Sequence, residues 1–170
     1  MKLILTGHDY AGKSTILKRV FQENDNGKMS YIHLSYREPT TFDFYTNTLE
    51  YSNFVMDRCF LDELIYPMIF GRQQGINKHE AKELLKKCEE KGITLGIVVC
   101  SQEEITRRIK ERVDIKEEPE VLQNIFLIKK MYEYLATEFN IPLIDTTNKT
   151  PDEVVEEVNK LVKEKTIHNK

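Results

Sequence analysis

The fold is decided by residues 2–24, KLILTGHDYAGKSTILKRVFQEN. A short apolar run leads to Gly7, four residues follow, and the chain continues as Gly12-Lys13-Ser14-Thr15 before an amphipathic segment. This is the G-x-x-x-x-G-K-[ST] pattern between a strand and a helix, the setting in which it forms a phosphate-binding loop. Glycine lets the backbone approach an anion closely, and the amides at a helix N-terminus carry partial positive charge. The sequence therefore predicts a nucleoside triphosphate site made by Gly7, Asp9, Ala11, Gly12, Lys13, Ser14 and Thr15.

Two residues of the loop carry specific tasks. Lys13 is expected to reach the β- and γ-phosphates of ATP, and Ser14 to ligate Mg²⁺. The alternative is a glycine turn before a helix with an incidental Lys-Ser, which the strand directly before the loop disfavours.

Composition excludes several classes of protein. The 170 residues suit one domain, 1–170, with 40% hydrophobic and 31% charged residues. A net charge of −3 gives no basic footprint for a polymeric nucleic acid or a membrane surface. Cys59, Cys88 and Cys100 lie far apart, which favours reduced thiols in a cytoplasmic protein over a metal site. The longest apolar runs are far shorter than a membrane span.

Apolar runs of strand length alternate with helical patterns. Strands are predicted at 2–6, 29–35, 53–57, 93–100 and 141–145. Helices are predicted at 78–91, 102–112, 120–139 and 151–164, several with capping pairs at their starts (Asn77 with Glu80, Ser101 with Glu104, Thr150 with Glu153). In the helix at 120–139, the side chains expected to face inward are Leu122, Ile125, Phe126, Ile128 and Leu135. We therefore expect an α/β protein, a three-layer α/β/α domain with a parallel sheet of strand order 2-3-1-4-5 and the phosphate loop at its carboxyl edge.

Charged residues follow two of the predicted strands. Arg37-Glu38-Pro39 comes after the second strand, where a side chain points into the ligand crevice of a parallel sheet. Asp57-Arg58 comes after the third strand. Asp57 could hold Mg²⁺ through water, and the planar fork of Arg58 suits a phosphate or carboxylate. The alternatives are a surface turn at Glu38 and a plain ion pair at Asp57.

A basic segment at 107–118 is the candidate lid. Most charge runs are solvated helix faces, but cationic groups must offset the charge on a transferring phosphoryl group. Arg108 and Arg112 are four residues apart and could share one helix face, so both are candidate catalytic residues.

Taken in order, these motifs resemble the thymidylate kinase-like branch of P-loop nucleotide kinases, to which deoxynucleoside kinases are related. The resemblance rests on the phosphate loop, Arg37-Glu38-Pro39, Asp57-Arg58, Tyr66, the basic segment and Tyr132, and covers residues 1 to about 162. It implies an acceptor site in which Asp9, Arg37 and Arg58 lie near the phosphate or sugar, Glu38 near the sugar, and Tyr66 and Tyr132 along the pocket. It also allows a homodimer, since thymidylate kinases commonly dimerise through helices flanking the sheet.

Two features depart from this family pattern. Tyr10 stands where one group of thymidylate kinases has a catalytic arginine, which leaves charge stabilisation to the lid. Only 19 positions separate Glu38 from Asp57, where the family has a longer helical segment that helps recognise the base. The aromatic residues in this short segment could stack a nucleobase, although core packing suits at least two of them: Phe42, Phe44, Tyr45 and Tyr51.

The sequence therefore predicts phosphoryl transfer from ATP·Mg²⁺ to a small nucleotide, with a nucleoside monophosphate as the first choice. Lys13 and Arg58 would act with the lid arginines as catalytic residues. In a deoxynucleoside kinase, Glu38 would instead take the proton of a sugar hydroxyl. A regulatory ATPase or a degenerate kinase acting as a nucleotide-binding subunit are further alternatives.

Overall fold

The computed structural model describes residues 1–35, 40–112 and 119–168, and, for the side chains, residues up to 165. Five parallel strands form one sheet in the order β2-β3-β1-β4-β5, as the sequence predicted. The strands are β1 (Lys2–Gly7), β2 (Ser30–His33), β3 (Phe54–Asp57), β4 (Thr94–Val99) and β5 (Leu143–Asp145). Each lies within a predicted range or one residue beyond it, and the second and fifth are shorter than expected.

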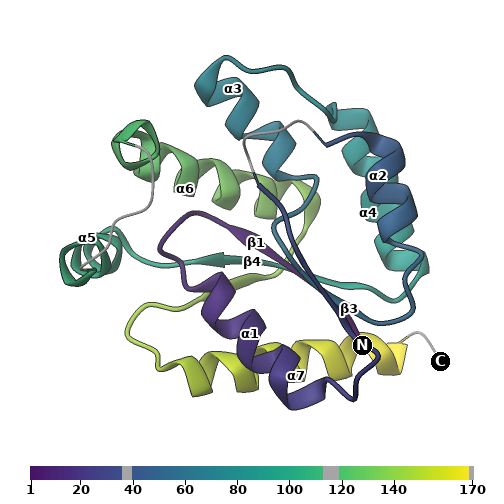
Figure 1. Ribbon diagram of the computed structural model, residues 1–170. Helices are drawn as coiled ribbons and strands as arrows, with labels where there is room; N and C mark the ends of the chain where they lie inside the picture. Colours follow the sequence, from purple (N-terminus) through teal and green to yellow (C-terminus); the bar gives the residue numbers. More distant parts are fainter. Residues whose placement is uncertain (36–39, 113–118, 169–170) are drawn as a thin grey trace.

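The helices cover both faces of the sheet, as Figure 1 shows. They are α1 (Lys13–Asn24), α2 (Phe42–Thr48), the 3₁₀ turn η1 (Asp62–Leu64), α3 (Tyr66–Phe70), α4 (Lys78–Glu90), α5 (Gln102–Glu111), α6 (Pro119–Phe139) and α7 (Pro151–His168). α1 and α7 lie on one face and α2, α3, α4 and α6 on the other, while α5 lies at the end of the sheet beside the phosphate loop. This is the predicted three-layer arrangement.

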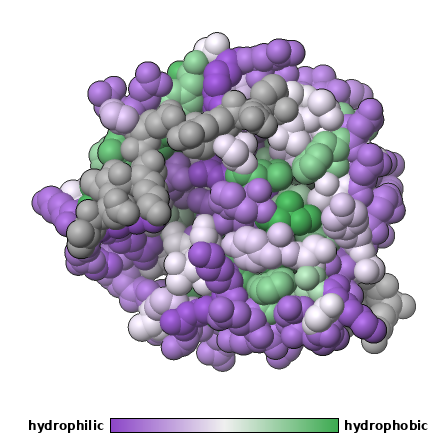
Figure 2. All heavy atoms as spheres, viewed as in Figure 1, coloured by the Kyte–Doolittle hydropathy of each residue, from purple (hydrophilic) through white to green (hydrophobic). Residues whose placement is uncertain are grey.

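Alternating side chains of the strands supply a core on each face. From β1, Leu3 and Leu5 pack with α1 and α7, whereas Ile4 packs with the helices of the opposite face. The strands of a sheet covered on both sides are apolar nearly throughout, which explains why the sequence showed continuous rather than alternating apolar runs. In Figure 2, hydrophilic residues dominate the rim of the molecule, and hydrophobic side chains show between the elements near its middle.

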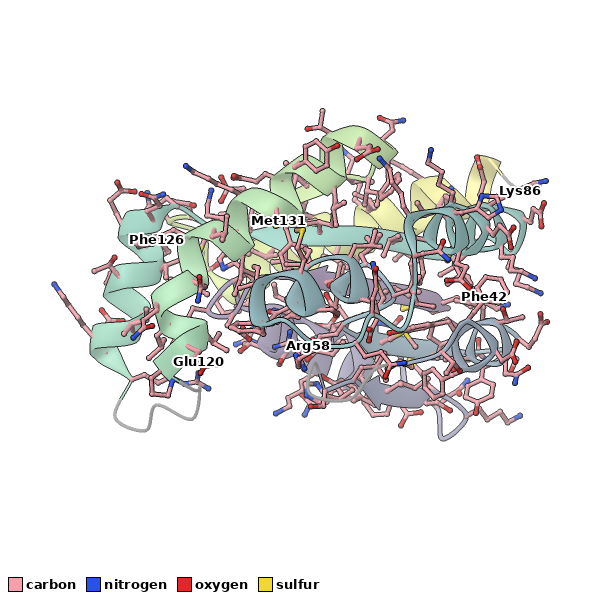
Figure 3. All side chains as sticks on the ribbon, turned by 90° about the horizontal axis from the view of Figure 1, so that it is seen from above. Phe42, Arg58, Lys86, Glu120, Phe126 and Met131 are labelled. Carbon is pink, nitrogen blue, oxygen red and sulfur yellow. The ribbon has the colours of Figure 1, made fainter. Side chains whose placement is uncertain are left out.

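The buried face of α6 differs from the predicted one. Val121, Ile125, Ile128, Tyr132 and Leu135 are buried, whereas Phe126 is 40% exposed. The prediction that Phe126 faces inward was wrong because the helix presents the i, i+4, i+7 set that starts at Val121 to the sheet. Figure 3 places Phe126 with Glu120 at one end of the molecule, far from Phe42 and Lys86 at the other.

Within the described part of the chain, no helix combines the length and apolar character needed to cross a lipid bilayer.

Candidate active site

The phosphate loop begins where β1 ends. Gly7 has φ +140°, and a Cβ at this position would lie 2.0 Å from the carbonyl oxygen of Val98 in β4. Gly12, at the N-cap of α1, has φ +94°. Both glycines are therefore required by the backbone: one by close approach to a neighbouring strand, and both by left-handed φ values. Tyr10 also adopts a positive φ, 65°, so the loop stores some backbone strain beside the site.

His8 is turned inward and ties the loop to the residue that follows β4. Its side chain is fully buried, its Nε2 accepts a hydrogen bond from the backbone amide of Cys100 over 3.1 Å, and its Nδ1 lies 2.7 Å from the carbonyl oxygen of Asp9. The ring is therefore the neutral tautomer with the proton on Nδ1. Burial, aided by the charge of Lys13, lowers the pKa of His8 to about 4, although the hydrogen bond to Asp9 acts in the opposite direction. His8 is a structural tie of the loop rather than a phosphate ligand.

Lys13 is the first residue of α1, and its side chain folds back over the phosphate loop. Its Nζ donates to the carbonyl oxygen of His8 over 2.7 Å, and the residue is 6% exposed. Burial lowers the pKa of this ammonium group, and the nearby charge of Arg58 lowers it further, while Asp9 and Asp57 act against them. An incoming phosphate would give this ammonium group a charge-assisted hydrogen-bond acceptor.

Ser14 and Asp57, the two residues that the sequence predicted as metal ligands, lie in contact. Ser14 Oγ donates to Asp57 Oδ2 over 2.5 Å, which brings the start of α1 to the end of β3. Asp57 is 1% exposed, and its other oxygen, Oδ1, is buried with no hydrogen-bond partner among the described residues. A buried carboxylate oxygen without a partner is costly, and the pair of hydroxyl and carboxylate oxygens is a donor set that Mg²⁺ prefers. These residues therefore fit a magnesium ion.

Arg58 is held by Asp9 and Tyr66. Arg58 Nη2 donates to Asp9 Oδ1 over 2.5 Å, Nη1 donates to the Tyr66 hydroxyl over 3.0 Å, and that hydroxyl lies 3.1 Å from Asp9 Oδ2. The guanidinium also lies over the Tyr66 ring, 5.3 Å from its centroid. Burial acts to raise the pKa of Asp9, but the charges of Arg58 and Lys13 outweigh it and leave that pKa below its usual value. Asp9 is thus an anion that fixes the cation beside the phosphate loop (Arg58 is labelled in Figure 3).

A buried carboxylate lies beneath this ion pair. Asp62 Oδ1 accepts from the hydroxyls of Thr6 and Tyr132, and Oδ2 accepts from the amide of Cys59 over 2.9 Å. Burial raises the pKa of Asp62, although the charge of Arg58 and these hydrogen bonds oppose the shift. Asp62 therefore links β1, η1 and α6 by hydrogen bonds beneath the Asp9–Arg58 pair.

Arg108 braces the phosphate loop. Its Nη1 donates to the carbonyl oxygen of Tyr10 over 2.8 Å, its Nη2 donates to the carbonyl oxygen of Thr146 over 3.1 Å, and its Nε donates to Glu104 Oε1 over 2.8 Å. A hydrogen bond from Arg107 is the main cause that lowers the pKa of Glu104 to about 2, and Arg108 adds to it. Arg108 therefore ties α5 to both the phosphate loop and the loop after β5.

The other arginines of α5 differ in their surroundings. The guanidinium of Arg112 lies over the ring of Tyr10, 5.4 Å from its centroid, at the mouth of the phosphate loop. Arg107 is paired with Glu104 and Glu111, and its side chain is 53% exposed. The predicted pair of lid arginines, Arg108 and Arg112, thus lies beside the loop, whereas Arg107 faces mainly outward.

One cavity of about 480 Å³ joins these groups. It runs from Asp57 and Arg58, along the phosphate loop, to a cleft between α5 and the loop after β5. Its lining includes the predicted residues Asp9, Ala11, Gly12, Lys13, Ser14, Thr15, Asp57, Arg58, Arg108 and Arg112. The volume is within the range of small-molecule sites.

Other predicted site residues lie elsewhere. Arg37 and Glu38 fall outside the described residues. Tyr66 and Tyr132 are at most 1% exposed, and neither lines the cavity. The sequence predicted them to line the pocket, but both lie behind its wall. In the short aromatic segment, Tyr45 is buried against Phe60, with ring centroids 5.7 Å apart, and serves the core.

Sequence reasoning missed several residues of the site. Glu104 was expected to complete a capping box with Ser101, but only the Ser101 half forms, and the carboxylate binds the two arginines instead. A carboxylate three and four residues before two arginines was the signal for this pairing. His33 and Asp62 were also missed, since each acquires its partners only through the sheet or the packing of α6.

Comparisons with known proteins agree with the fold. No protein-family model matches the sequence, and none of the curated proteins is significantly similar to it. Among solved structures, YorR from Bacillus subtilis, in complex with phosphorylated GDP, superposes with a TM-score of 0.79 and 18% identity over 96% of each chain. The fold is that of the P-loop nucleotide kinases.

Two kinases of known structure also share this fold. Thymidylate kinase from Candida albicans has a TM-score of 0.60 and 18% identity, over 99% of this chain and 92% of the other. Deoxyadenosine kinase from M. mycoides, with bound dCTP, has a TM-score of 0.56 and 15% identity, over 95% and 98% of the two chains. At these identities the likeness establishes the fold.

Proposed function

We propose that the chain is a phosphotransferase that moves the γ-phosphoryl group of ATP to a nucleoside monophosphate. The observation that carries this proposal is the convergence of Lys13, the Ser14–Asp57 pair and the two arginines Arg58 and Arg108 on one cavity. A triphosphate would bring its negative charge to this group of cations, and the buried Asp57 oxygen that has no partner among the described residues could ligate a divalent ion.

Each residue has a defined task in this proposal. The loop amides and Lys13 hold the β- and γ-phosphates, and Ser14 and Asp57 hold Mg²⁺. When bound, Mg²⁺ neutralises charge on the phosphate oxygens. Arg112 lies over Tyr10 at the mouth of the loop, where its charge can offset the charge that develops during transfer. Arg108, whose hydrogen bonds hold the loop, acts by keeping the loop in shape.

The acceptor phosphate is assigned to the end of the cavity formed by Asp9 and Arg58. Arg58 is 8% exposed, contacts Asp9 and lines the same cavity as the phosphate loop, so a phosphate that binds it would lie near the bound triphosphate. A monophosphate with a second pKa near ~6 is already a nucleophile at neutral pH and needs no base. The nucleotides bound by YorR and by the deoxyadenosine kinase support a cavity that accepts nucleotides.

A deoxynucleoside kinase is the second candidate, and one observation favours it. Arg58 is already compensated by the carboxylate of Asp9 over 2.5 Å, so the pair carries no net charge toward an acceptor. A neutral sugar would tolerate this better than a phosphate. Glu38 would then take the proton of the sugar hydroxyl.

The experiment is an assay of ADP formation with a panel of nucleosides and nucleoside monophosphates. We expect turnover with a monophosphate, and a fall of about 10²-fold or more in the Lys13→Ala variant. Glu38→Gln separates the two candidates: turnover of a hydroxyl acceptor should fall by about 10²–10⁴-fold, and turnover of a monophosphate far less. ATP hydrolysis that no acceptor changes would refute both candidates and favour a regulatory ATPase.

A further inference from the structure

His33 is a cavity residue to which the proposed reaction assigns no task. It ends β2, and its Cα is paired with that of Asp57 across the β2–β3 ladder. Side chains alternate along a strand, so His33 lies on the same face as Tyr31, which packs edge to face with Phe21 of α1 at 5.7 Å. His33 therefore lies on the face of the sheet that carries the phosphate-loop helix, and it lines the cavity.

Asp57 receives two hydrogen bonds on one oxygen. Ser14 Oγ donates to Oδ2 over 2.5 Å, and His33 Nδ1 lies 3.2 Å from the same oxygen. A carboxylate has only acceptor atoms, so the proton of this contact belongs to the imidazole. With Oδ2 occupied twice, the rotation of the carboxylate is fixed, and Oδ1 is left buried with no partner in the described part of the chain.

We propose that His33 is a positioning residue of the metal site: its Nδ1–H holds Asp57 so that Oδ1 stays available to the metal ion or to its water. This rests on the proposed function, since it requires a metal–triphosphate complex in the cavity. Residues that orient a metal-binding carboxylate typically contribute about 10–100-fold to metal affinity. His33 suits the task because its side chain is 58% exposed, so the contact with Asp57 comes from the strand pairing rather than from core packing.

The donor atom can be tested by two isosteric substitutions. An asparagine amide places its nitrogen where Nδ1 lies, whereas a glutamine amide places it near Nε2. We therefore expect His33→Asn to keep the hydrogen bond to Asp57, and His33→Gln and His33→Ala to lose it.

The measurement is Mn²⁺ binding by electron paramagnetic resonance, with the protein saturated by a non-hydrolysable ATP analogue. We expect Mn²⁺ affinity to fall about 10-fold in His33→Ala and His33→Gln and to stay within about twofold of the original in His33→Asn. Binding of the analogue without metal, and the thermal midpoint of unfolding, should be the same in all four proteins.

Two results would overturn the inference. Equal Mn²⁺ affinity in all four proteins would show that Asp57 needs no help, and an equal loss in all three variants would show that the Nδ1 position is not what matters. Failure of the proposed function is distinguishable from either. In that case the unsubstituted protein itself would not bind the Mn²⁺–analogue complex, and the inference would fall with it.

Discussion

The buried imidazole of His8 makes the stability of the protein depend on pH. Its pKa in the folded state is about 4, against 6.5 for a free histidine. Above the unfolded value, both states hold the neutral ring, and the packing of His8 contributes fully. As the pH falls from 6.5 to 4, the unfolded chain gains a proton that the folded protein excludes, so the folded protein loses stability.

The expected size follows from the pKa difference. A shift of 2.5 units, from 6.5 to about 4, corresponds to about 3 kcal/mol at 1.36 kcal/mol per unit. His8 is fully buried, so solvent screening gives little reduction. Below pH 4 both states carry the proton, and this contribution no longer changes.

The assay is urea unfolding from about pH 7 to about pH 4, compared with the same series for His8→Gln. Glutamine retains an acceptor for the amide of Cys100 but does not titrate. We expect the free energy of unfolding of the unsubstituted protein to fall by about 3 kcal/mol more than that of the variant across this window. Parallel pH curves for the two proteins would refute the reasoning, because they would mean that His8 is solvated or charged in the folded state.

Three further predictions concern stability. Gly7→Ala should destabilise the protein by more than about 3 kcal/mol, measured by chemical unfolding, because a Cβ would lie 2.0 Å from a carbonyl oxygen of β4; a loss below about 1 kcal/mol would contradict this geometry. Arg108→Ala should lower the free energy of unfolding by about 2 kcal/mol and weaken triphosphate binding, because it removes the hydrogen bond to the phosphate loop. Arg107→Ala removes only exposed ion pairs and should lower the free energy of unfolding by less than about 1 kcal/mol. Calorimetry of both variants tests this difference, and equal losses of stability would contradict the role given to Arg108. Tyr132→Phe should cost about 1–3 kcal/mol because it removes a donor from the buried carboxylate of Asp62, and an unchanged unfolding midpoint would exclude that contribution.

The elements that the sequence predicts well are those with local signals. The Asn77–Glu80 capping box is complete in the structure, and the Thr150–Glu153 pair also forms both of its hydrogen bonds. The pairing of Ser14 with Asp57 was predictable too, because a phosphate-loop hydroxyl and a carboxylate at the end of an adjacent parallel strand meet at the same edge of the sheet.

The features that could not be predicted from the sequence are those that depend on the direction in which a side chain points. His8 belongs to a loop that lines the cavity, yet its ring points away toward the residue that follows β4. Asp62 is a charged residue five positions after Asp57, and only the packing of α6 over η1 buries it. In α6, Ile125, Ile128 and Leu135 are buried as predicted, but Val121 and Tyr132 are buried in place of Leu122 and Phe126. Composition and spacing do not encode these orientations, because they arise when distant segments pack together.

The brace formed by Arg108 has a consequence for biosynthesis. The groups that hold the shape of the phosphate loop, Arg108 and Thr146, lie 98 and 136 positions after Tyr10 in the chain (108 − 10 and 146 − 10). Contacts so distant in sequence are slow to form, and a nascent chain that ends before β5 lacks one of them. A ligand bound in the phosphate loop should therefore stabilise the loop only when the segments that carry Arg108 and Thr146 have folded.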